Sequence, residues 1–242
     1  MENEFYRFEF KYNLEPGLAR LIESELKNYG MRLDKHVCKK KQNYTVTSLY
    51  FDSCHLSDYY DKIDGLLKRK KLRARIYEPC LKESNTVWLE VKEKYDMKIH
   101  KKRFGLTRDE WETFLKKGPS SLLKINEKSG AKGTKNDVLW HFLSNPVKPF
   151  VFIRYIRRPY ILDDDFRITF DSKIEACKNN CLDYNKFMSP VKNNGVIMEV
   201  KFSHLLPFWF KNIIRKYNIR RGAFSKYSNS VDAVYLHNPL SK

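Results

Sequence analysis

The chain has 242 residues, and its 47 Lys and Arg against 29 Asp and Glu give a formal charge of +18. Hydrophobic residues make up 42% and aromatic residues 14% of the sequence, which excludes an intrinsically disordered chain. No stretch reaches the roughly 18 apolar residues that are needed to cross a bilayer. The excess of positive charge predicts an anionic partner, which at this point is nucleic acid, an anionic membrane or a phosphate compound.

The first residues and the cysteines indicate the cellular compartment in which the protein is expected. The segment MENEFYRFEFKYN is acidic and then mixed, so it does not form a secretory signal. The five cysteines are odd in number and include no CxxC pair, which is typical of free thiols in a reducing compartment. We therefore expect a soluble, cytoplasmic protein with a single domain over residues 1–242.

Strand patterns outnumber helix patterns along the chain. In chain order, the sequence predicts a strand at 5–13, a helix at 16–28, a strand at 44–52, a helix at 55–63, and strands at 70–78, 87–94 and 98–106. Helices follow at 108–116 and 136–143, then strands at 150–158, 166–171 and 195–203, then a helix at 205–216 and a closing helix after Ser228. Segments 35–42 and 116–135 are predicted to be loops.

Charged and apolar residues alternate along five of these strands, in the segments 7–11, 73–76, 90–92, 167–171 and 199–202. Because strand side chains point alternately to opposite faces, each strand presents one apolar and one charged face. On a single strand the charged face normally meets water. Repeated Arg and Lys on five strands repel one another unless an anion lies between them, and the Arg fork fits phosphate oxygens. If the eight strands close into a barrel, the charged faces line a basic tunnel that suits a chain of phosphates.

The motifs on these strands, taken in order, resemble a known family, the polyphosphate polymerase domain of the vacuolar transporter chaperone (VTC) proteins, a branch of the triphosphate tunnel metalloenzymes. The matching segments are RFEFKY (7–12), TSLYFDS (47–53), YYDKIDG (59–65), KLRARIY (71–77), WLEVKEK (88–94), HKKRF (100–104), YIRRPY (155–160), FRITFD (166–171), IMEVKF (197–202) and FSKY (224–227). The resemblance implies an α+β fold: a closed, mostly antiparallel eight-stranded β-barrel with helices packed outside.

The first motif distinguishes branches of that superfamily. The adenylyl cyclase and thiamine triphosphatase branch carries a Glu-x-Glu-x-Lys strand, whereas this sequence has Arg7, Glu9 and Lys11 at those positions. Arginine in place of the first acid resembles the polymerase branch.

The resemblance implies transfer of the ATP γ-phosphate onto a growing inorganic polyphosphate chain, with release of ADP. It implies catalytic roles for Lys92, Arg157, Glu199 and Lys226, and it assigns Mn²⁺ or Mg²⁺ to Glu199. Glu9 and Glu90 are expected to hold neighbouring Lys and Arg side chains in place. The residues expected to bind the phosphates of ATP and polyphosphate are Lys11, Arg73, Arg75, Lys92, Lys101, Arg103, Tyr155, Arg157, Arg167, Lys201, Ser225 and Lys226.

Other functions stay open at this point. One is hydrolysis of triphosphate or nucleoside triphosphate, and another is binding of polyphosphate without turnover. Specific nucleic-acid binding is not expected, because the basic residues alternate on strands and do not cluster on a helix or a stacking surface. The eukaryotic complexes of the family also carry an inositol-phosphate-sensing domain and membrane helices. This sequence shows neither, and a separate membrane-protein partner remains open.

Overall fold

The computed structural model describes residues 8–35, 37, 42–96, 98–125, 134–183 and 188–236, so Arg7 lies outside the described residues. Its centre is one antiparallel sheet of ten strands. Eight strands follow the order β1-β10-β8-β7-β3-β4-β5-β6, and two short strands pair at the sides, β2 with β7 and β9 with β8. The strands are β1 (Phe8–Leu14), β2 (Arg32–Leu33), β3 (Tyr44–Ser53), β4 (Lys68–Ile76), β5 (Val87–Tyr95), β6 (Lys98–Leu106), β7 (Val147–Ile161), β8 (Phe166–Lys178), β9 (Ser189–Pro190) and β10 (Val196–Phe202).

The helices lie around this sheet. They are α1 (Pro16–Asn28), α2 (Ser57–Ile63), α3 (Arg108–Lys117), α4 (Thr134–Leu143), α5 (Phe208–Lys216) and α6 (Lys226–Val231). Short 3₁₀ segments occur at Leu81–Glu83 and Pro119–Lys124, and a π-helical segment, Asp232–Leu236, follows α6. None of the helices in the described part of the chain has the length and hydropathy of a membrane span.

Each of the eight predicted strands has a counterpart in the described residues, although residues 5–7 of the first lie outside them. Each predicted helix is also present, and the closing helix begins at Lys226. The α+β class is therefore confirmed. β7 and β8 are longer than expected, and β8 continues past its charged motif because residues 175–178 pair with 151–154 of β7. α5 begins at Phe208 and not at 205, since Pro207 occupies its N-cap in an extended conformation. The short strands β2 and β9 carry no periodic pattern and were not expected.

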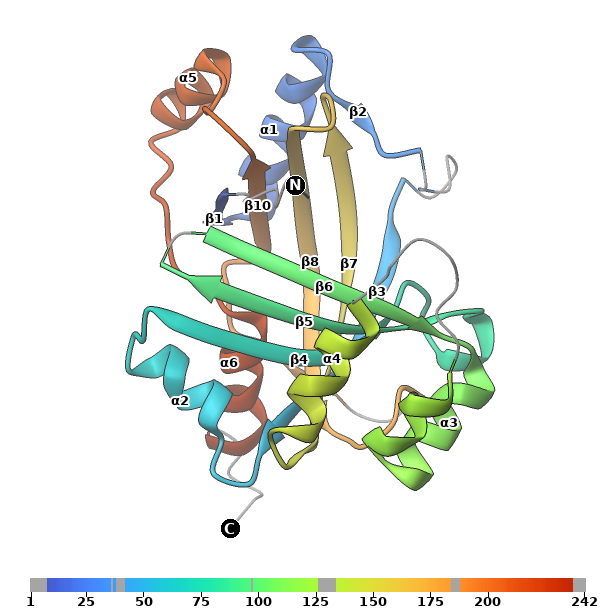
Figure 1. Cartoon of the computed structure of the whole chain (residues 1–242). Helices are drawn as coiled ribbons and strands as arrows, with labels where there is room; N and C mark the ends of the chain where they lie inside the picture. Colours follow the sequence, from blue (N-terminus) through green and yellow to red (C-terminus); the bar gives the residue numbers. More distant parts are fainter. Residues whose placement is uncertain are drawn as a thin grey trace.

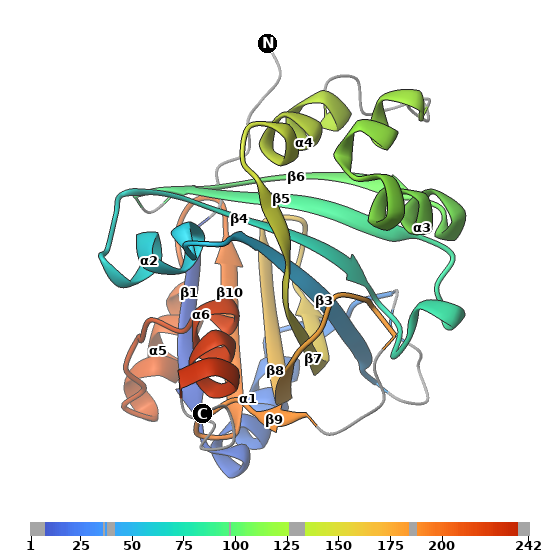
Figure 2. The same cartoon turned by 90° about the horizontal axis from the view of Figure 1, so that it is seen from below.

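The sheet bends so strongly that its two halves face each other. In Figure 1, β4, β5 and β6 cross in front of β7, β8 and β10, and the view turned by 90° shows the two layers of strands facing each other (Figure 2). The expected closed barrel is not confirmed, because no hydrogen-bonded pairing joins β1 to β6 in the described strands. Instead the outer edge of β1 pairs with the segment before α6, through a bridge between Tyr12 and Arg221 and a hydrogen bond from Gly222 N to Lys11 O of 2.9 Å.

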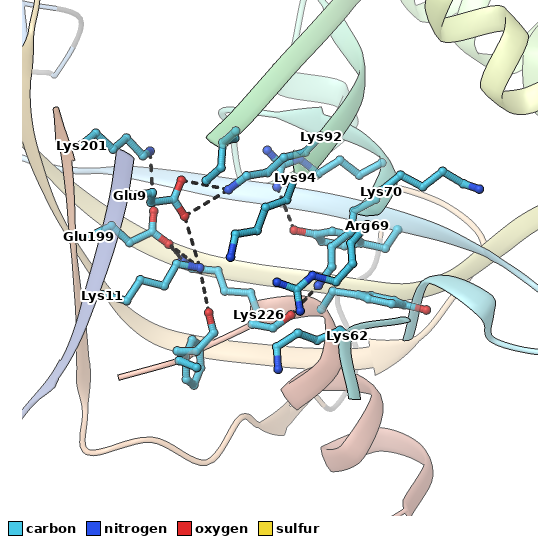
Figure 3. Close-up of a pocket in the computed structure, with 18 of the residues that line it drawn as sticks. Glu9, Lys11, Lys62, Arg69, Lys70, Lys92, Lys94, Glu199, Lys201 and Lys226 are labelled. Atoms are coloured by element: carbon cyan, nitrogen blue, oxygen red, sulfur yellow. Dashed lines mark hydrogen bonds and ion pairs between the residues drawn. The ribbon is translucent and has the colours of Figure 1, made fainter. Parts of the chain in front are cut away.

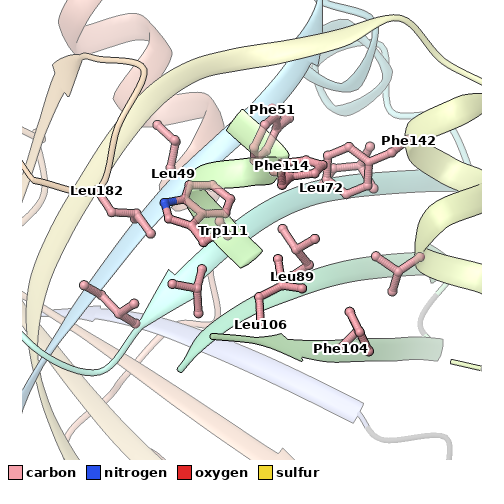
Figure 4. Packing of buried hydrophobic residues seen from close by; sticks show 14 of the residues in the cluster. Leu49, Phe51, Leu72, Leu89, Phe104, Leu106, Trp111, Phe114, Phe142 and Leu182 are labelled. Atoms are coloured by element: carbon pink, nitrogen blue, oxygen red, sulfur yellow. The ribbon is translucent and has the colours of Figure 1, made fainter. Parts of the chain in front are cut away.

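Two hydrophobic clusters cover the convex face of the bent sheet. The first lies between β3–β6 and the helices α3 and α4, and it includes Trp111, Phe114 and Phe142 (Figure 4). The second lies between β1, β8 and β10 and the helices α1 and α5, with Phe170 and Phe210 fully buried. The apolar residues of the alternating strands therefore point outward into these clusters, as the period of two requires.

A third cluster lies on the concave side. It joins Ile153 and Ile174 of the sheet to Tyr227 and Val231 of α6. The C-terminal helix thus fills one part of the concave side with apolar side chains. The charged residues occupy the rest of it, so the alternating pattern leads to a cavity that α6 bounds.

Candidate functional site

A cavity of about 510 Å³ lies on the concave side of the sheet. Thirteen Lys and Arg side chains line it, but only two carboxylates do, those of Glu9 and Glu199. Figure 3 shows these two acids close to Lys11 and Lys201, with further basic side chains reaching in from the opposite strands. The excess of cations makes the cavity an anion site.

Strand register explains how the side chains come together. Lys11 of β1 lies opposite Glu199 of β10, and Glu9 lies opposite Lys201. Residues directly opposite in an antiparallel pair share a face, so all four point into the cavity. The same rule places Arg157 of β7 beside Asp171 of β8.

Glu199 lies at the centre of the ion-pair network. Its Oε1 is 2.6 Å from Lys226 Nζ and 3.7 Å from Lys11 Nζ. Its Oε2 is 3.2 Å from Arg157 Nη2 and 3.6 Å from Lys201 Nζ. Although burial opposes ionisation, these four cations hold the pKa of Glu199 well below its usual range. Glu199 is therefore a carboxylate at every physiological pH.

Asp171 makes the second strong contact to the same cations. Arg157 donates to both of its carboxylate oxygens at 2.7 Å, and Lys226 Nζ lies 2.6 Å from Oδ2. Burial raises the pKa of Asp171, but Arg157 and Lys226 lower it by more. Arg157 and Lys226 are thus fixed by two carboxylates each, which keeps their charges in place before any ligand arrives.

The N-terminus of α6 brings Ser225 and Lys226 to the cavity. Ser225 is the N-cap, and its side chain accepts from Ser228 N at 3.1 Å. Lys71 Nζ donates to Ser225 Oγ at 2.6 Å. Burial, together with the nearby charges of Lys11 and Lys92, lowers the pKa of Lys71 well below its ordinary value.

Glu90 lies beneath the cavity and is fully buried. It accepts from Arg73 Nε at 2.7 Å, lies 3.8 Å from Arg75 Nη1 and pairs with Lys101. Burial opposes its charge, but Arg73, Arg75 and Lys101 hold the pKa of Glu90 far below its usual range. Arg73 also donates to Tyr50 Oη at 2.9 Å. Glu90 thus contacts three basic side chains, and its expected supporting role stays a prediction.

Glu9 connects β1, at one end of the sheet, with β5 near the other end. Lys92 of β5 donates to its oxygens at 2.9 and 3.1 Å, and Lys11 Nζ lies 3.3 Å away. Burial raises the pKa of Glu9, but Lys92 and Lys11 lower it by more. Lys201, on the opposite strand, has its pKa lowered to about 8 by burial, in spite of Glu199.

The structure brings most of the predicted site residues together. Those that line the cavity are Glu9, Lys11, Arg73, Arg75, Lys92, Tyr155, Arg157, Glu199, Lys201, Ser225 and Lys226. Tyr155 faces Arg157 and Lys226 with its ring, whose centroid is 5.3 and 4.9 Å from the two cations.

Three predicted phosphate-binding residues do not line the cavity. Lys101 is paired with Glu90. The Arg103 guanidinium lies over the Trp88 ring, 4.4 Å from its centroid. Arg167 is paired with Asp34. The alternation of the sequence gives the face of a strand correctly, but it does not show how far along the strand the cavity extends.

Several cavity residues were not predicted. Lys71 and Lys94 could have been found, since they continue the alternation that places Arg73 and Lys92 on the concave face. Arg221 could not, because it lies in an irregular segment that no pattern places beside β1.

The residues present fit a divalent ion only as part of a larger set of ligands. No group of three or more His, Cys, Asp or Glu in the described ranges could hold an ion alone. Glu9 and Glu199 offer hard oxygens on either side of Lys11, which suits Mg²⁺ or Mn²⁺ when phosphate and water supply the other ligands.

Comparison with known proteins identifies the family. The sequence profile of the VTC domain matches residues 6–235. The chain belongs to the VTC domain family. This confirms the resemblance carried by the strand motifs. No curated protein sequence matches the chain significantly.

Solved structures show the fold that this VTC domain shares. A putative adenylate cyclase from Bacillus halodurans is 14% identical, with 90% of this chain and 93% of that chain covered and a TM-score of 0.52. A putative adenylyl cyclase from Hippeastrum, described as having a dominant triphosphatase activity, is 13% identical, with coverage of 96% and 97% and a TM-score of 0.54. At these identities the likeness is one of fold, and it agrees with the expected place of the VTC domain in the triphosphate tunnel superfamily.

Proposed function

We propose that this VTC domain is a polyphosphate polymerase, which transfers the γ-phosphate of ATP to the end of an inorganic polyphosphate chain. The observation that carries the proposal is the charge of the cavity, with thirteen cations and two carboxylates along its lining. Two polyanions must meet end to end in this reaction, so their repulsion is the main obstacle, and fixed cations offset it.

In the proposed step, a terminal oxygen of the polyphosphate attacks the γ-phosphorus of ATP. The bond from that phosphorus to the β–γ bridging oxygen breaks, and the oxygen leaves as part of ADP. Arg157 and Lys226 are held by Asp171 and Glu199, and they would neutralise the charge on the transferred group. Lys92, fixed by Glu9, would orient the phosphates from the other half of the sheet.

A bound Mg²⁺ or Mn²⁺ would neutralise phosphate charge further. We assign Glu199 to hold it, with Glu9 on the other side of Lys11. Each carboxylate already contacts lysines. When the ion binds to a carboxylate, these lysines would be released to contact the phosphates. We further propose that β1 and β6 enclose the chain as a tunnel when phosphate is bound, with Glu9 and Lys92 spanning the two ends.

Incubation of the purified protein with ATP and Mn²⁺ is expected to give long phosphate chains, seen on a gel, and ADP in equal amount to the phosphate incorporated. Glu199→Gln removes the central carboxylate charge and is expected to reduce synthesis by at least about 100-fold. Glu175→Gln, at a half-exposed pair with Arg154 outside the cavity, is the matched control and should retain activity. Absence of product from folded wild-type protein, across metals and primers, would contradict the proposal.

Hydrolysis of triphosphate is the second candidate, because the Hippeastrum protein with the same fold is described as a triphosphatase. Water would then replace the polyphosphate end as acceptor. The same assay separates the two, since hydrolysis gives free phosphate without polymer. Unchanged ATP together with tight polyphosphate binding would identify a binding module.

A further inference from the structure

The cavity cations fall into two groups that differ in their counterions. Eight of them lie within 4 Å of a carboxylate: Lys11, Lys70, Arg73, Arg75, Lys92, Arg157, Lys201 and Lys226. In the described part of the chain, no carboxylate lies within that distance of the remaining five, which are Lys62, Arg69, Lys71, Lys94 and Arg221. Lys71 instead contacts Ser225. We call the other four, Lys62, Arg69, Lys94 and Arg221, the rim cations.

Strand register places two of the rim cations, Arg69 and Lys94, outside the inner site. Along the β4–β5 pair, Arg73 lies opposite Glu90, the next pair on the same face joins two lysines, and the pair after that is Arg69 and Lys94. Each step of two residues moves about 7 Å along the strand. Exposure rises in the same direction on this face, from the fully buried Glu90 to the partly buried Lys92 and Lys94. Arg69 and Lys94 therefore lead from the inner site toward solvent.

The two strand pairs on either side of the cavity, β1 with β10 and β4 with β5, differ in which charges lie opposite each other. On β1 and β10, each lysine lies opposite a glutamate. On β4 and β5, Arg69 lies opposite Lys94, a like-charge pair that is unfavourable by itself. Burial and the charges of Arg69 and Arg221 lower the pKa of Lys94, so these three cations are close enough to repel one another. In Figure 3, Lys62, Arg69 and Lys94 reach into the space opposite Glu9 and Glu199.

We propose that the rim cations form a second phosphate-binding site, which holds the part of a polyphosphate chain that extends beyond the inner site. The inner cations carry their own carboxylates and suit a short phosphate group, whereas the rim lacks counterions and needs several phosphates to supply them. The inference rests on the proposed function for its ligand class, a linear polyphosphate. It adds that the protein binds long polyphosphate chains more tightly than it binds triphosphate.

The test measures binding of tripolyphosphate and of long-chain polyphosphate by calorimetry, without ATP. The variant Arg69→Ala with Lys94→Ala is expected to weaken long-chain binding about tenfold or more and to change tripolyphosphate binding less than about twofold. The slope of log affinity against log salt for the long chain should fall by about 2, because each of the two removed cations neutralises about one phosphate. Each variant is first checked for a wild-type thermal unfolding midpoint.

The matched control is Lys68→Ala with Lys102→Ala. Lys68 is the exposed neighbour of Arg69 on β4, and Lys102 pairs with Asp137 on the convex face. This control removes the same charge without touching the cavity and should leave both affinities unchanged. Equal losses for the two ligands in the rim variant, no loss for either, or an equal loss in the control would each overturn the second site.

A charge-reversal variant, Lys94→Glu, provides an independent check and should weaken long-chain binding more than Lys94→Ala does. A wild-type protein that binds no long polyphosphate would overturn both this inference and the proposed function. Length-dependent binding without synthesis from ATP would overturn the proposed function alone.

Discussion

Two buried carboxylates compensate the positive charge of the basic side chains at the centre of the cavity. Glu199 and Asp171 share Arg157 and Lys226, so four buried or nearly buried charges form one compensated group. Removing one member would leave an uncompensated buried charge among the other three, which is far more costly than the net value of the group. The acids thus permit the cations to be buried and oriented at once.

Asp58 is a carboxyl group of a different kind, since its side chain is buried and neither of its oxygens accepts a hydrogen bond from the described residues. Lys70 Nζ is 3.9 Å away, while Asp52 and Asp61 add negative charge. Burial, and then Asp52, raise the pKa of Asp58 from its ordinary value of 3.8 to about 7. The folded state therefore holds a proton that the unfolded state loses near pH 4.

This difference predicts the effect of Asp58→Asn. The contribution of Asp58 to stability is fully present below about pH 4 and is lost as pH rises to about 7. Asparagine stays neutral, so at pH 8 the variant should be more stable by about 1–3 kcal/mol, and the gain should vanish toward pH 4. Urea unfolding at both pH values measures it. The exposed Asp64→Asn serves as control, and a variant less stable than wild type at pH 8 would contradict this assignment.

At the scale of residues, the sequence indicates most of the site. The alternation of Arg and Lys with apolar residues is enough to place Lys11, Lys92, Arg157 and Lys201 on one face. Arg167 shares this face, opposite Lys201, but it does not line the cavity and pairs with Asp34 from a segment distant in sequence. Such a contact depends on tertiary packing, which cannot be inferred from the alternation of residues along one strand.

Among the elements, β10 depends on a turn that packs against the start of α1. Gly195 has φ +112°, and an added Cβ would lie 2.8 Å from Pro16 Cγ. Side chains are strained in that conformation, and the contact is too close for any carbon. The turn thus fixes where β10, and with it Glu199, enters the sheet.

Gly195→Ala is expected to destabilise the protein by about 2–4 kcal/mol, from the combined backbone strain and overpacking. Gly17→Ala offers a control one residue beyond Pro16, since a Cβ there meets nothing within 4 Å. Because alanine favours the helix, that change should be neutral or stabilise by up to about 1 kcal/mol. Denaturant midpoints compare the two variants, and equal stabilities would contradict the role of the turn.

The strands themselves are the most predictable elements. Their period of two and their β-branched and aromatic residues fix both the element and its buried face, as β6 shows, with the expected bounds Lys98–Leu106. Short pairings such as β2 with β7 form only because the sheet brings the segments together. No local pattern of two residues could indicate them.

The molecule as a whole carries a charge of +18, and the cavity concentrates part of it. The sequence suggests a barrel, but closure depends on how far apart β1 and β6 lie after all intervening strands have twisted. The segment at Arg221 and Gly222 takes up part of the β1 edge instead. Closure is thus a property of the complete sheet, which no single strand encodes.

Filling the cavity with an anion should stabilise the whole fold. A ligand at about 100 times its Kd adds about 2.7 kcal/mol, which corresponds to about 5–10 °C in Tm for a chain of this size. Tripolyphosphate at low salt is expected to give such a shift, and the shift should shrink as sodium chloride screens the cations. Sodium chloride at the same ionic strength, without tripolyphosphate, is the control. No shift at any tripolyphosphate concentration would contradict an anion site in the cavity.

The contact of β1 with the segment before α6 also has a consequence for how the protein folds. Lys11 Nζ donates to Phe224 O, 213 positions further along the chain, at 2.7 Å. During synthesis, β1 leaves the ribosome long before β10 and α6 have been made. Until then β1 cannot form its contacts with these segments. Contacts between such distant segments slow folding, because the intervening loop must be closed first. The phosphate site therefore forms late, and nascent chains that lack β10 and α6 cannot hold a polyanion in it.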